Sequence, residues 1–216
     1  MKKLVETEEF IKAAKLNRFG GTGTARILMM LLRINKINKI FSDISHLNGI
    51  EFIDRLFDEL KISFEVGEEE LNRIPKTGAF ISVSNHPFGG IDGLLLVKVL
   101  SMVRPDIKVL ANFLMQRVEP AKEFMLPLNP FEENKIVKPG ISGIKYALKH
   151  LKDGFPLGVF PAGEVSSYNQ ISIDISDKEW QSAALKMIRK AGVPIVPVYF
   201  QGSNSRLFHL LGLIHP

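Results

Sequence analysis

The stretch Ser84-Asn85-His86-Pro87-Phe88-Gly89-Gly90-Ile91-Asp92 lies between two apolar runs, residues 79–83 and 94–100. The first run, Ala79-Phe80-Ile81-Ser82-Val83, is short and rich in β-branched and aromatic residues, which is typical of a buried strand. The second run is longer and rich in leucine, and it indicates a helix. A strand that turns directly into a helix is the repeating unit of an α/β fold.

His86 and Asp92 make the turn between these runs a candidate catalytic site. Imidazole titrates near neutral pH, and a carboxylate hydrogen-bonded to one ring nitrogen fixes the tautomer that can abstract a proton. The spacing is also compatible with a structural role, in which Asp92 is the N-cap of the helix that follows. Spacing alone leaves both interpretations open.

Further along, strand-like and helical runs alternate, which predicts an α/β fold with a mixed, largely parallel sheet flanked by helices. Helices are also expected near residues 7–16, 25–41 and 49–60, with a break at residues 20–24. We therefore expect an N-terminal helical region over residues 1–60 and an α/β domain over residues 61–216. The apolar residues 210–216 either pack on this fold or indicate a chain truncated at its C-terminus. The expected strands are 62–66, 79–83, 107–110, 157–160 and 195–200, and the expected helices of the second region are 94–103, 140–151 and 178–190.

The amino-acid composition excludes some kinds of site and limits the kinds of partner that the protein can bind. The 216 residues include no cysteine, which excludes disulfides and thiolate chemistry. The net charge of +5 is compatible with anionic membranes, nucleic acids or an acidic carrier protein. No secretory signal is visible, and the most apolar run, residues 27–32, is too short to span a bilayer. We expect a cytoplasmic protein attached peripherally to the inner face of the membrane.

The expected helix over residues 25–41 is a possible membrane-docking segment, because it combines apolar residues with Arg26, Arg33, Lys36 and Lys39. Each basic residue near an anionic lipid surface contributes about 1 kcal/mol. A helix packed on the core with solvated basic residues fits the same pattern, so both interpretations stay open.

Three more blocks stand where strands are expected to end, and the carboxyl ends of parallel strands gather the site of an α/β sheet. One spans residues 112–134 and contains Arg117. Another, residues 159–167, indicates the end of a strand and a Pro-Ala-Gly turn, which are followed by the acidic Glu164 and the hydroxyl groups of Ser166 and Ser167. The last, residues 192–199, has prolines that suit the start of a strand or an edge strand, and this block is expected to shape the pocket floor.

The blocks at residues 85–92, 159–167 and 192–198 resemble, in order, three motifs of the glycerolipid (PlsC-like) or lysophospholipid acyltransferases. They are similar to Asn-His-x4-Asp, to Phe-Pro-Glu-Gly-Thr-Arg-Ser and to Gly-Ile-Pro-Val-Pro-Val. The resemblance covers about residues 60–205. It implies that His86 deprotonates an acceptor hydroxyl, which attacks an acyl thioester directly, and that Asp92 orients His86. Backbone amides near Gly89 and Gly90 would stabilise the oxyanion.

The resemblance also implies the substrates: a lyso-lipid at a membrane surface and a thioester of acyl carrier protein or coenzyme A. We expect no metal, no cofactor besides the acyl thioester and no nucleic acid. The implied substrate-binding residues are Asn85, Gly89, Gly90, Arg117, Phe160, Pro161, Gly163, Glu164 and Ser166.

Two departures from the family motifs point to the acceptor. Five residues rather than four separate His86 from Asp92, and the glycine pair can absorb the extra one. The motif arginine, a natural phosphate ligand, is replaced by Ser166 or Ser167, with Arg117, Lys138 and Arg206 as possible substitutes. The variant resembles the haemolysin-like branch, which includes lyso-ornithine and lyso-glycine lipid O-acyltransferases with acceptors that lack phosphate.

Lysophosphatidate acylation is the alternative activity, and a non-enzymatic lipid-binding protein is the alternative from another class. A serine hydrolase is disfavoured because no Gly-x-Ser-x-Gly string occurs. The five histidines form no metal-site spacing, and the basic residues form no nucleic-acid motif.

Overall fold

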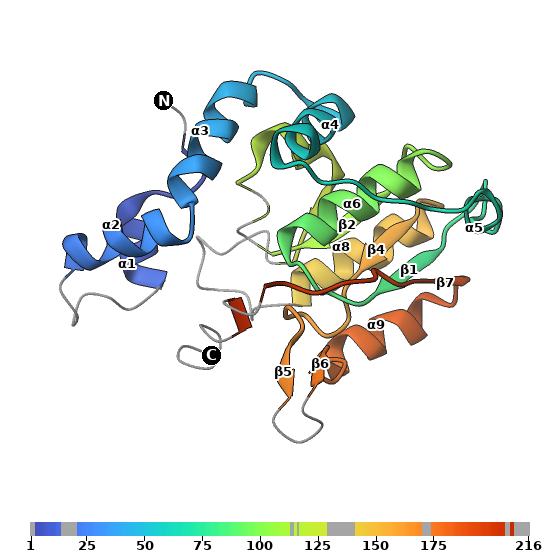
Figure 1. Cartoon of the computed structure of the whole chain (residues 1–216). Coiled ribbons are helices and arrows are strands. Elements are labelled where there is room, and N and C mark those ends of the chain that lie inside the picture. The colour runs from blue at the N-terminus through green and yellow to red at the C-terminus, as the bar shows by residue number, and fades with distance from the viewer. Residues whose placement is uncertain are drawn as a thin grey trace. The chain divides into compact units, whose positions relative to one another are not determined.

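The computed structural model describes residues 3–13, 21–112, 115, 117–128, 141–169, 174–205 and 208–209 (Figure 1). The chain divides into two compact units. Of the described residues, the first unit comprises those up to residue 64 together with 117–121, and the second comprises those of 65–116 and those from residue 122 on. Among the described residues, no helix has both the length and the apolar content to cross a bilayer.

The first unit is helical, which confirms the predicted N-terminal helices. Its helices are α1 (Thr7–Ala13), α2 (Gly21–Leu31), α3 (Ile34–Ile44) and α4 (Gly49–Leu60). Asn38 on α3 fixes the start of the chain, because its side-chain amide bonds to the backbone of Leu4 and Val5 at 2.9–3.0 Å. Phe41 and Phe52 meet edge to face at 6.1 Å between α3 and α4.

Two expectations for this unit are wrong. Residues 25–41 do not form one helix: the chain leaves α2 after Leu31 and starts α3 at Ile34, with Arg33 in the left-handed region at φ 56°. Residues 21–24 do not break the chain but form the first turn of α2. A glycine costs about 1 kcal/mol in a helix, which a first turn tolerates. Residues 14–16 of the first expected helix lie outside the described residues.

The second unit is built on a parallel sheet, which confirms the predicted α/β class. Among the described residues, its strands are ordered β3-β2-β4-β1-β7, all neighbours being parallel. They are β1 (Ile81–Ser84), β2 (Lys108–Ala111), β3 (Met125–Pro127), β4 (Leu157–Val159) and β7 (Ile195–Val198). Ile81 pairs with Leu157 on one side and with Ile195 on the other. β7 lies at an edge, as its prolines predict.

Helices cover both faces of this sheet (Figure 1). On one face, Ile81, Val83, Leu157 and Val159 form a core with residues of α8 (Ile141–Lys152) and α9 (Ser182–Ala191). Side chains alternate along a strand, so Gly158 faces the other way, and Leu96 of α6 (Gly90–Ser101) lies over it. The smaller elements are α5 (Glu68–Asn72), a 3-10 helix (Glu119–Phe124) and the antiparallel pair β5 (Ser167–Asn169) and β6 (Asp174–Ser176).

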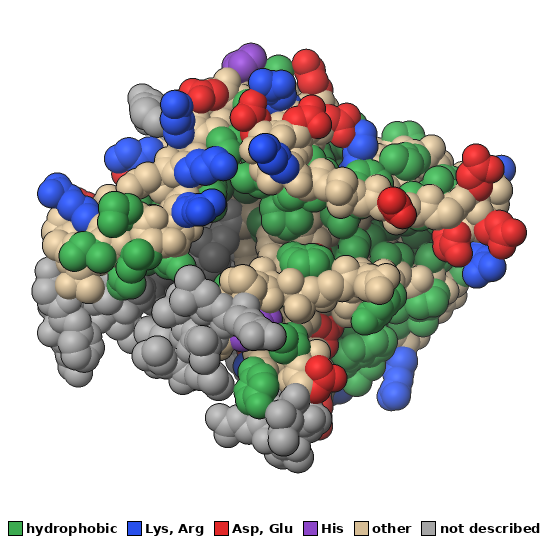
Figure 2. Space-filling model, in the orientation of Figure 1, with side chains coloured by type: hydrophobic (Ala, Val, Ile, Leu, Met, Phe, Trp, Pro, Cys, Tyr) green, Lys and Arg blue, Asp and Glu red, His purple; other side chains and the backbone are tan. Residues whose placement is uncertain are grey.

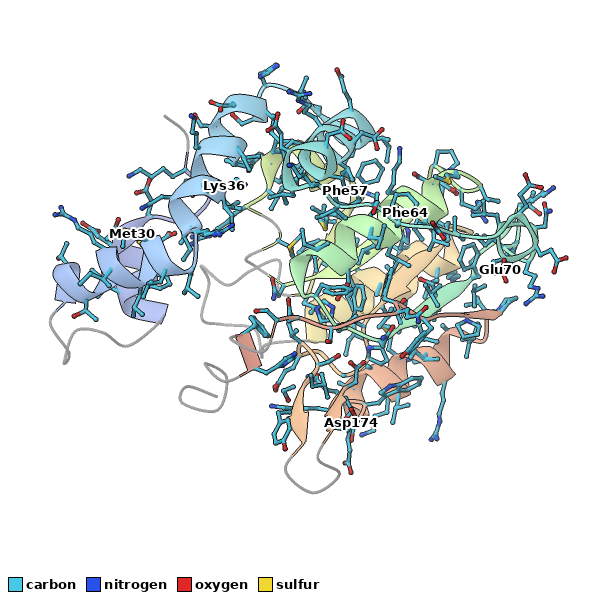
Figure 3. All side chains as sticks on the ribbon, in the orientation of Figure 1. Met30, Lys36, Phe57, Phe64, Glu70 and Asp174 are labelled. Atoms are coloured by element: carbon cyan, nitrogen blue, oxygen red, sulfur yellow. The ribbon has the colours of Figure 1, made fainter. Side chains whose placement is uncertain are left out.

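Four of the five expected strands are present within two residues of the predicted bounds, and the expected strand over residues 62–66 is wrong. Phe64 instead packs edge to face on Phe57 of α4, with ring centroids 6.5 Å apart (Figure 3). An apolar run that packs against a preceding helix satisfies the same hydrophobic pattern as a strand.

Candidate active site

The carboxyl end of β1 carries the candidate base, His86, and the residue before it joins two strand ends. Asn85 donates from Nδ2 to the carbonyl of Phe200 at 2.9 Å and accepts from the Phe200 N–H at 2.7 Å. Because both polar atoms of Asn85 are bonded to the chain beyond β7, this side chain fixes the loop that carries His86.

His86 and Asp92 form a hydrogen-bonded pair. Nδ1 of His86 lies 2.9 Å from Oδ2 of Asp92, whose side chain is fully buried, while the His86 side chain is 17% exposed. A carboxylate accepts from the protonated ring nitrogen, so this contact places the proton on Nδ1 and leaves the Nε2 lone pair free. The arrangement is that of an oriented general base.

The same carboxylate also caps helix α6. Oδ2 of Asp92 accepts from the backbone N–H groups of Phe88 at 2.8 Å and Gly89 at 3.0 Å. Gly89 is the N-cap and Asp92 stands at the third helical position, so the expectation that Asp92 is itself the N-cap is wrong. One carboxylate therefore holds both the helix start and the imidazole.

The extra residue between His86 and Asp92 is accommodated at Gly89. Its φ of 77° lies in the region that other residues rarely adopt. Gly90 begins α6, and a Cβ there would lie 2.9 Å from Sδ of Met115. Gly89 thus adopts the unusual backbone conformation, and the missing side chain of Gly90 leaves room for Met115.

Phe160, directly after β4, lies against the imidazole. The rings of His86 and Phe160 are stacked with centroids 4.2 Å apart, and Phe160 stacks in turn on Phe200 at 6.4 Å. The ring of His86 is therefore held by the Asp92 carboxylate and by the stacked ring of Phe160, and both contacts limit its rotation.

A clamp that sequence reasoning missed holds the backbone of His86. Its N–H donates to both carboxylate oxygens of Asp177 at 3.1 and 3.2 Å, and its carbonyl accepts from the Ser166 N–H at 2.9 Å. The Ser166 hydroxyl completes the clamp by donating to Asp177. Ser166 precedes β5 and Asp177 follows β6, so this antiparallel pair brings them together. Asp177 stands outside every block that the sequence singled out.

The turn after Phe160 is anchored to α9. Gly163, at φ 72°, closes it by donating to the Phe160 carbonyl at 3.0 Å. Gln181, the N-cap of α9, donates from its backbone to the Pro161 carbonyl at 2.9 Å and from its side chain to the Ala162 carbonyl at 3.2 Å.

Two of the expected binding residues are in ion pairs. Glu164 is exposed and paired with Lys178. Arg117 belongs to the first unit, where its guanidinium pairs with Glu9 at 2.6 Å. Lys138 and Arg206, the other expected phosphate ligands, lie outside the described residues.

A histidine whose Nδ1 is bonded to a carboxylate has the geometry to take a proton from a hydroxyl through Nε2. Similarity to known proteins extends over nearly the whole chain. Residues 9–214 match a family described as acyltransferase. The chain belongs to this acyltransferase family. Two similar proteins are named lyso-glycine lipid O-acyltransferase. The one from Phocaeicola vulgatus is 24% identical over 219 residues, covering 98% of this chain and 74% of the relative. The one from Bacteroides thetaiotaomicron is 26% identical over 211 residues, covering 96% and 74%.

The predicted acyltransferase family is thus confirmed, and so is the prediction of an enzyme. The branch that the sequence motifs resemble includes proteins with the name that the two distant relatives carry. Backbone N–H donors lie at the start of α6, close in the chain to the candidate base His86. The Gly89 N–H is bonded to Asp92, whereas the N–H groups of Gly90 and Ile91 open helix α6 and have no acceptor within it. Among the described residues, no cluster of histidine and acidic side chains has the geometry to hold a metal ion.

Proposed function

We propose that this acyltransferase moves a fatty acyl chain from an acyl thioester to the hydroxyl of a lyso-lipid without phosphate, of the lyso-glycine lipid kind. The observation that carries the proposal is the 2.9 Å contact between Nδ1 of His86 and Asp92, which leaves Nε2 to act as the base. The names of the two relatives support the acceptor class.

In the proposed reaction, Nε2 of His86 takes the proton of the acceptor hydroxyl as its oxygen attacks the thioester carbonyl carbon. The resulting tetrahedral oxyanion is stabilised by the N–H groups of Gly90 and Ile91 at the start of α6. The carbon–sulfur bond then breaks, and the imidazolium returns the proton to the departing thiolate. Asp92 stabilises the imidazolium throughout, and no acyl-enzyme forms.

The surroundings of Ser166 support an acceptor without phosphate. Residues 160–167, which resemble the family motif that contains an arginine, include no arginine, and the Ser166 hydroxyl is bonded to the Asp177 carboxylate. Nearby, the Lys178 ammonium is paired with Glu164. Phosphate binding favours cations with unused donors, and this part of the site presents carboxylates instead.

The test is an acyl-transfer assay that pairs labelled acyl carrier protein and acyl-coenzyme A with lyso-glycine lipid, lyso-ornithine lipid and lysophosphatidate. We expect product with an amino-acid lyso-lipid. Product from lysophosphatidate alone would overturn the acceptor class and leave the alternative activity.

His86→Ala tests the base in the same assay. We expect acyl transfer to fall about 10²- to 10⁴-fold, while binding of the lyso-lipid persists. His46→Ala, at an exposed position of the first unit, is the matched control and should keep full activity. A His86→Ala enzyme with unchanged acyl transfer would remove His86 from the mechanism.

We also propose that the first unit docks on the membrane where the lipid acceptor lies. Ile27, Met30 and Leu31 of α2 are 58%, 63% and 62% exposed and follow helical spacing, so they share one face. Figure 2 shows hydrophobic side chains gathered over α2 and basic side chains over α3, and Figure 3 labels Met30 and Lys36 on the two helices. Exposed apolar and basic residues together are typical of an interfacial surface.

A further inference from the structure

Helices α8 and α9 carry an unusual concentration of positive charge. They hold six of the 28 Lys and Arg residues and none of the 23 Asp and Glu residues, so the rest of the chain has a net charge of −1. His150 on α8 adds no charge, because burial lowers the pKa of its imidazole below the ordinary value. The six cations are Lys145, Lys149, Lys152, Lys186, Arg189 and Lys190, and all are exposed.

Between these two helices lies a groove of about 550 Å³, here called the α8–α9 groove. Its apolar lining, here called the floor, includes the half-buried Ile144 and Leu148 and the buried Met187. Three exposed lysines, Lys145, Lys186 and Lys190, also line the groove and are here called its rim. Within the described part of the chain, none of these three lysines is ion-paired, whereas Lys149 pairs with Asp153 at 2.5 Å. The groove thus combines an apolar floor with lysines that are available to a partner.

The groove begins near the catalytic centre of the second unit. In a parallel sheet, the helix that follows a strand starts at the strand's carboxyl edge, which here is the edge that carries His86. The groove reaches Ser182, the first residue of α9. Gln181, directly before it, is hydrogen-bonded to the Pro161–Ala162 turn, which follows the Phe160 ring stacked on His86.

We propose that the α8–α9 groove is the docking site for the acyl donor in the form of a small acidic acyl carrier protein. The inference rests on the proposed function, because it names the donor of that reaction. An acidic helix with a few apolar side chains matches the groove, its carboxylates meeting the lysine rim and its apolar residues meeting the floor.

The shape and spread of the charge favour a protein over other anions. Helices of 12 and 10 residues extend about 18 and 15 Å, which suits an extended acidic surface better than the compact phosphates of a coenzyme. The floor is recessed, with Met187 only 1% exposed, so a flat bilayer surface does not reach it.

The first experiment measures binding of purified acyl carrier protein by fluorescence anisotropy at low and physiological salt. We expect Lys145→Glu with Lys186→Glu to weaken binding at least tenfold, and wild-type binding to weaken as salt rises. The charge-matched control is Arg73→Glu with Lys76→Glu, two exposed residues of the same unit outside α8 and α9, and it should bind as wild type does. Equal loss in both variants, or no loss in either, would overturn the proposal.

A third variant separates shape from charge. Ala183→Arg adds positive charge but places a long side chain at an exposed position that lines the groove. We expect at least fivefold weaker binding because the floor is blocked. Binding that is unchanged or tighter would show that charge alone attracts the partner and would overturn the groove as the docking site.

The donor assay distinguishes this inference from the proposed function. The Lys145→Glu, Lys186→Glu enzyme should show a KM for acyl carrier protein at least tenfold higher, with kcat/KM for acyl-coenzyme A changed less than twofold. An equal loss with coenzyme A, or loss of vesicle binding, would overturn the proposal in favour of a coenzyme or membrane site. Binding needs no acyl transfer, so a wild-type enzyme that binds the carrier yet acylates no lyso-lipid would contradict the proposed function alone.

Discussion

One oxygen atom of Asp92 has both the catalytic role that we propose and a structural role at the start of α6, and two substitutions separate these roles. Oδ2 accepts from Nδ1 of His86 and from the N–H groups of Phe88 and Gly89. Asp92→Asn keeps an acceptor in place but removes the charge that stabilises the imidazolium. We expect kcat to fall about 10²-fold or more, with little change in the thermal unfolding midpoint.

Asp92→Ala is the comparison. It should lose the same activity and also destabilise the fold by about 1–3 kcal/mol for each backbone donor left unpaired. Unfolding followed by circular dichroism reports stability, and the acyl-transfer assay reports kcat. An Asp92→Asn enzyme with wild-type kcat would show that the carboxylate only caps α6.

The sequence predicted the residues of the site that lie close together in the chain. His86 and Asp92 are six positions apart, and the turn that joins them also brings them into contact. Asp177 reaches His86 only because β5 and β6 pair, and no local pattern encodes that pairing. Tertiary contacts of this kind cannot be inferred from spacing.

We propose that Asp177 positions His86, and its substitution should then change turnover rather than acceptor binding. Asp177→Ala leaves the His86 N–H without its acceptor and frees the Ser166 hydroxyl. Because a displacement of about 1 Å at a reacting group can cost 10²-fold in rate, we expect kcat to fall about 10- to 10²-fold. The KM for the lyso-lipid should stay within twofold.

Asp177→Asn provides the discriminating comparison. Its amide oxygen can still accept from the His86 N–H, so it should recover most of the lost kcat. A change confined to KM, or an asparagine variant as impaired as the alanine variant, would argue against the positioning role.

At the scale of elements, replacing either of two glycines of the second unit by alanine should change stability, in opposite directions. A Cβ at Gly158 in β4 would lie 2.7 Å from Leu96 and 3.0 Å from Val109, both buried, so Gly158→Ala should destabilise the unit by about 1–3 kcal/mol. At Gly93 in α6, no described atom lies within 4 Å of the added Cβ, and Gly93→Ala should stabilise the helix by up to about 1 kcal/mol.

Urea unfolding of the two variants measures both effects in one host. The proximity of α6 to β4 predicts the difference in sign. Gly158→Ala with wild-type stability would show that α6 does not pack directly on that strand.

Hydrophobic periodicity predicted the buried strands and most of the helices, because those elements have burial patterns that local sequence reveals. It did not predict β3, whose three residues end in Pro127 and which lies at an edge of the sheet. Such a short edge strand forms because it pairs with β2, and its own three residues show no recognisable strand pattern. The break at Arg33 was also missed, since no glycine or proline marks it.

At the scale of the whole molecule, the proposed roles fall on different units. His86, Asp92 and the clamp residues belong to the unit with the parallel sheet, whereas α2 and α3 belong to the helical unit. The alternation of strands and helices predicted the fold class of the sheet unit. The sequence pattern of residues 25–41 did not decide whether this segment packs on the core or contacts lipid. Either arrangement requires a helix with one apolar face.

Because α2 has an exposed apolar face, we predict that α2 and α3 contact lipid, and this can be tested by membrane binding. Arg33, Lys36 and Lys39 are exposed, and changing all three to glutamate reverses the charge beside the apolar face. Because each basic residue contributes about 1 kcal/mol at an anionic surface, binding to anionic vesicles should fall at least about 10²-fold. Vesicle co-sedimentation across a series of anionic lipid fractions measures this change.

A second variant, Met30→Ser with Leu31→Ser, removes apolar area without changing charge. It should weaken binding to anionic and zwitterionic vesicles alike, because burial of apolar side chains does not depend on the headgroup charge. Both variants should keep wild-type turnover on a short-chain acceptor in solution, since neither touches His86 or its partners. If both variants bind vesicles as wild type does, α2 and α3 are not the docking surface and the acceptor must be reached through another part of the chain.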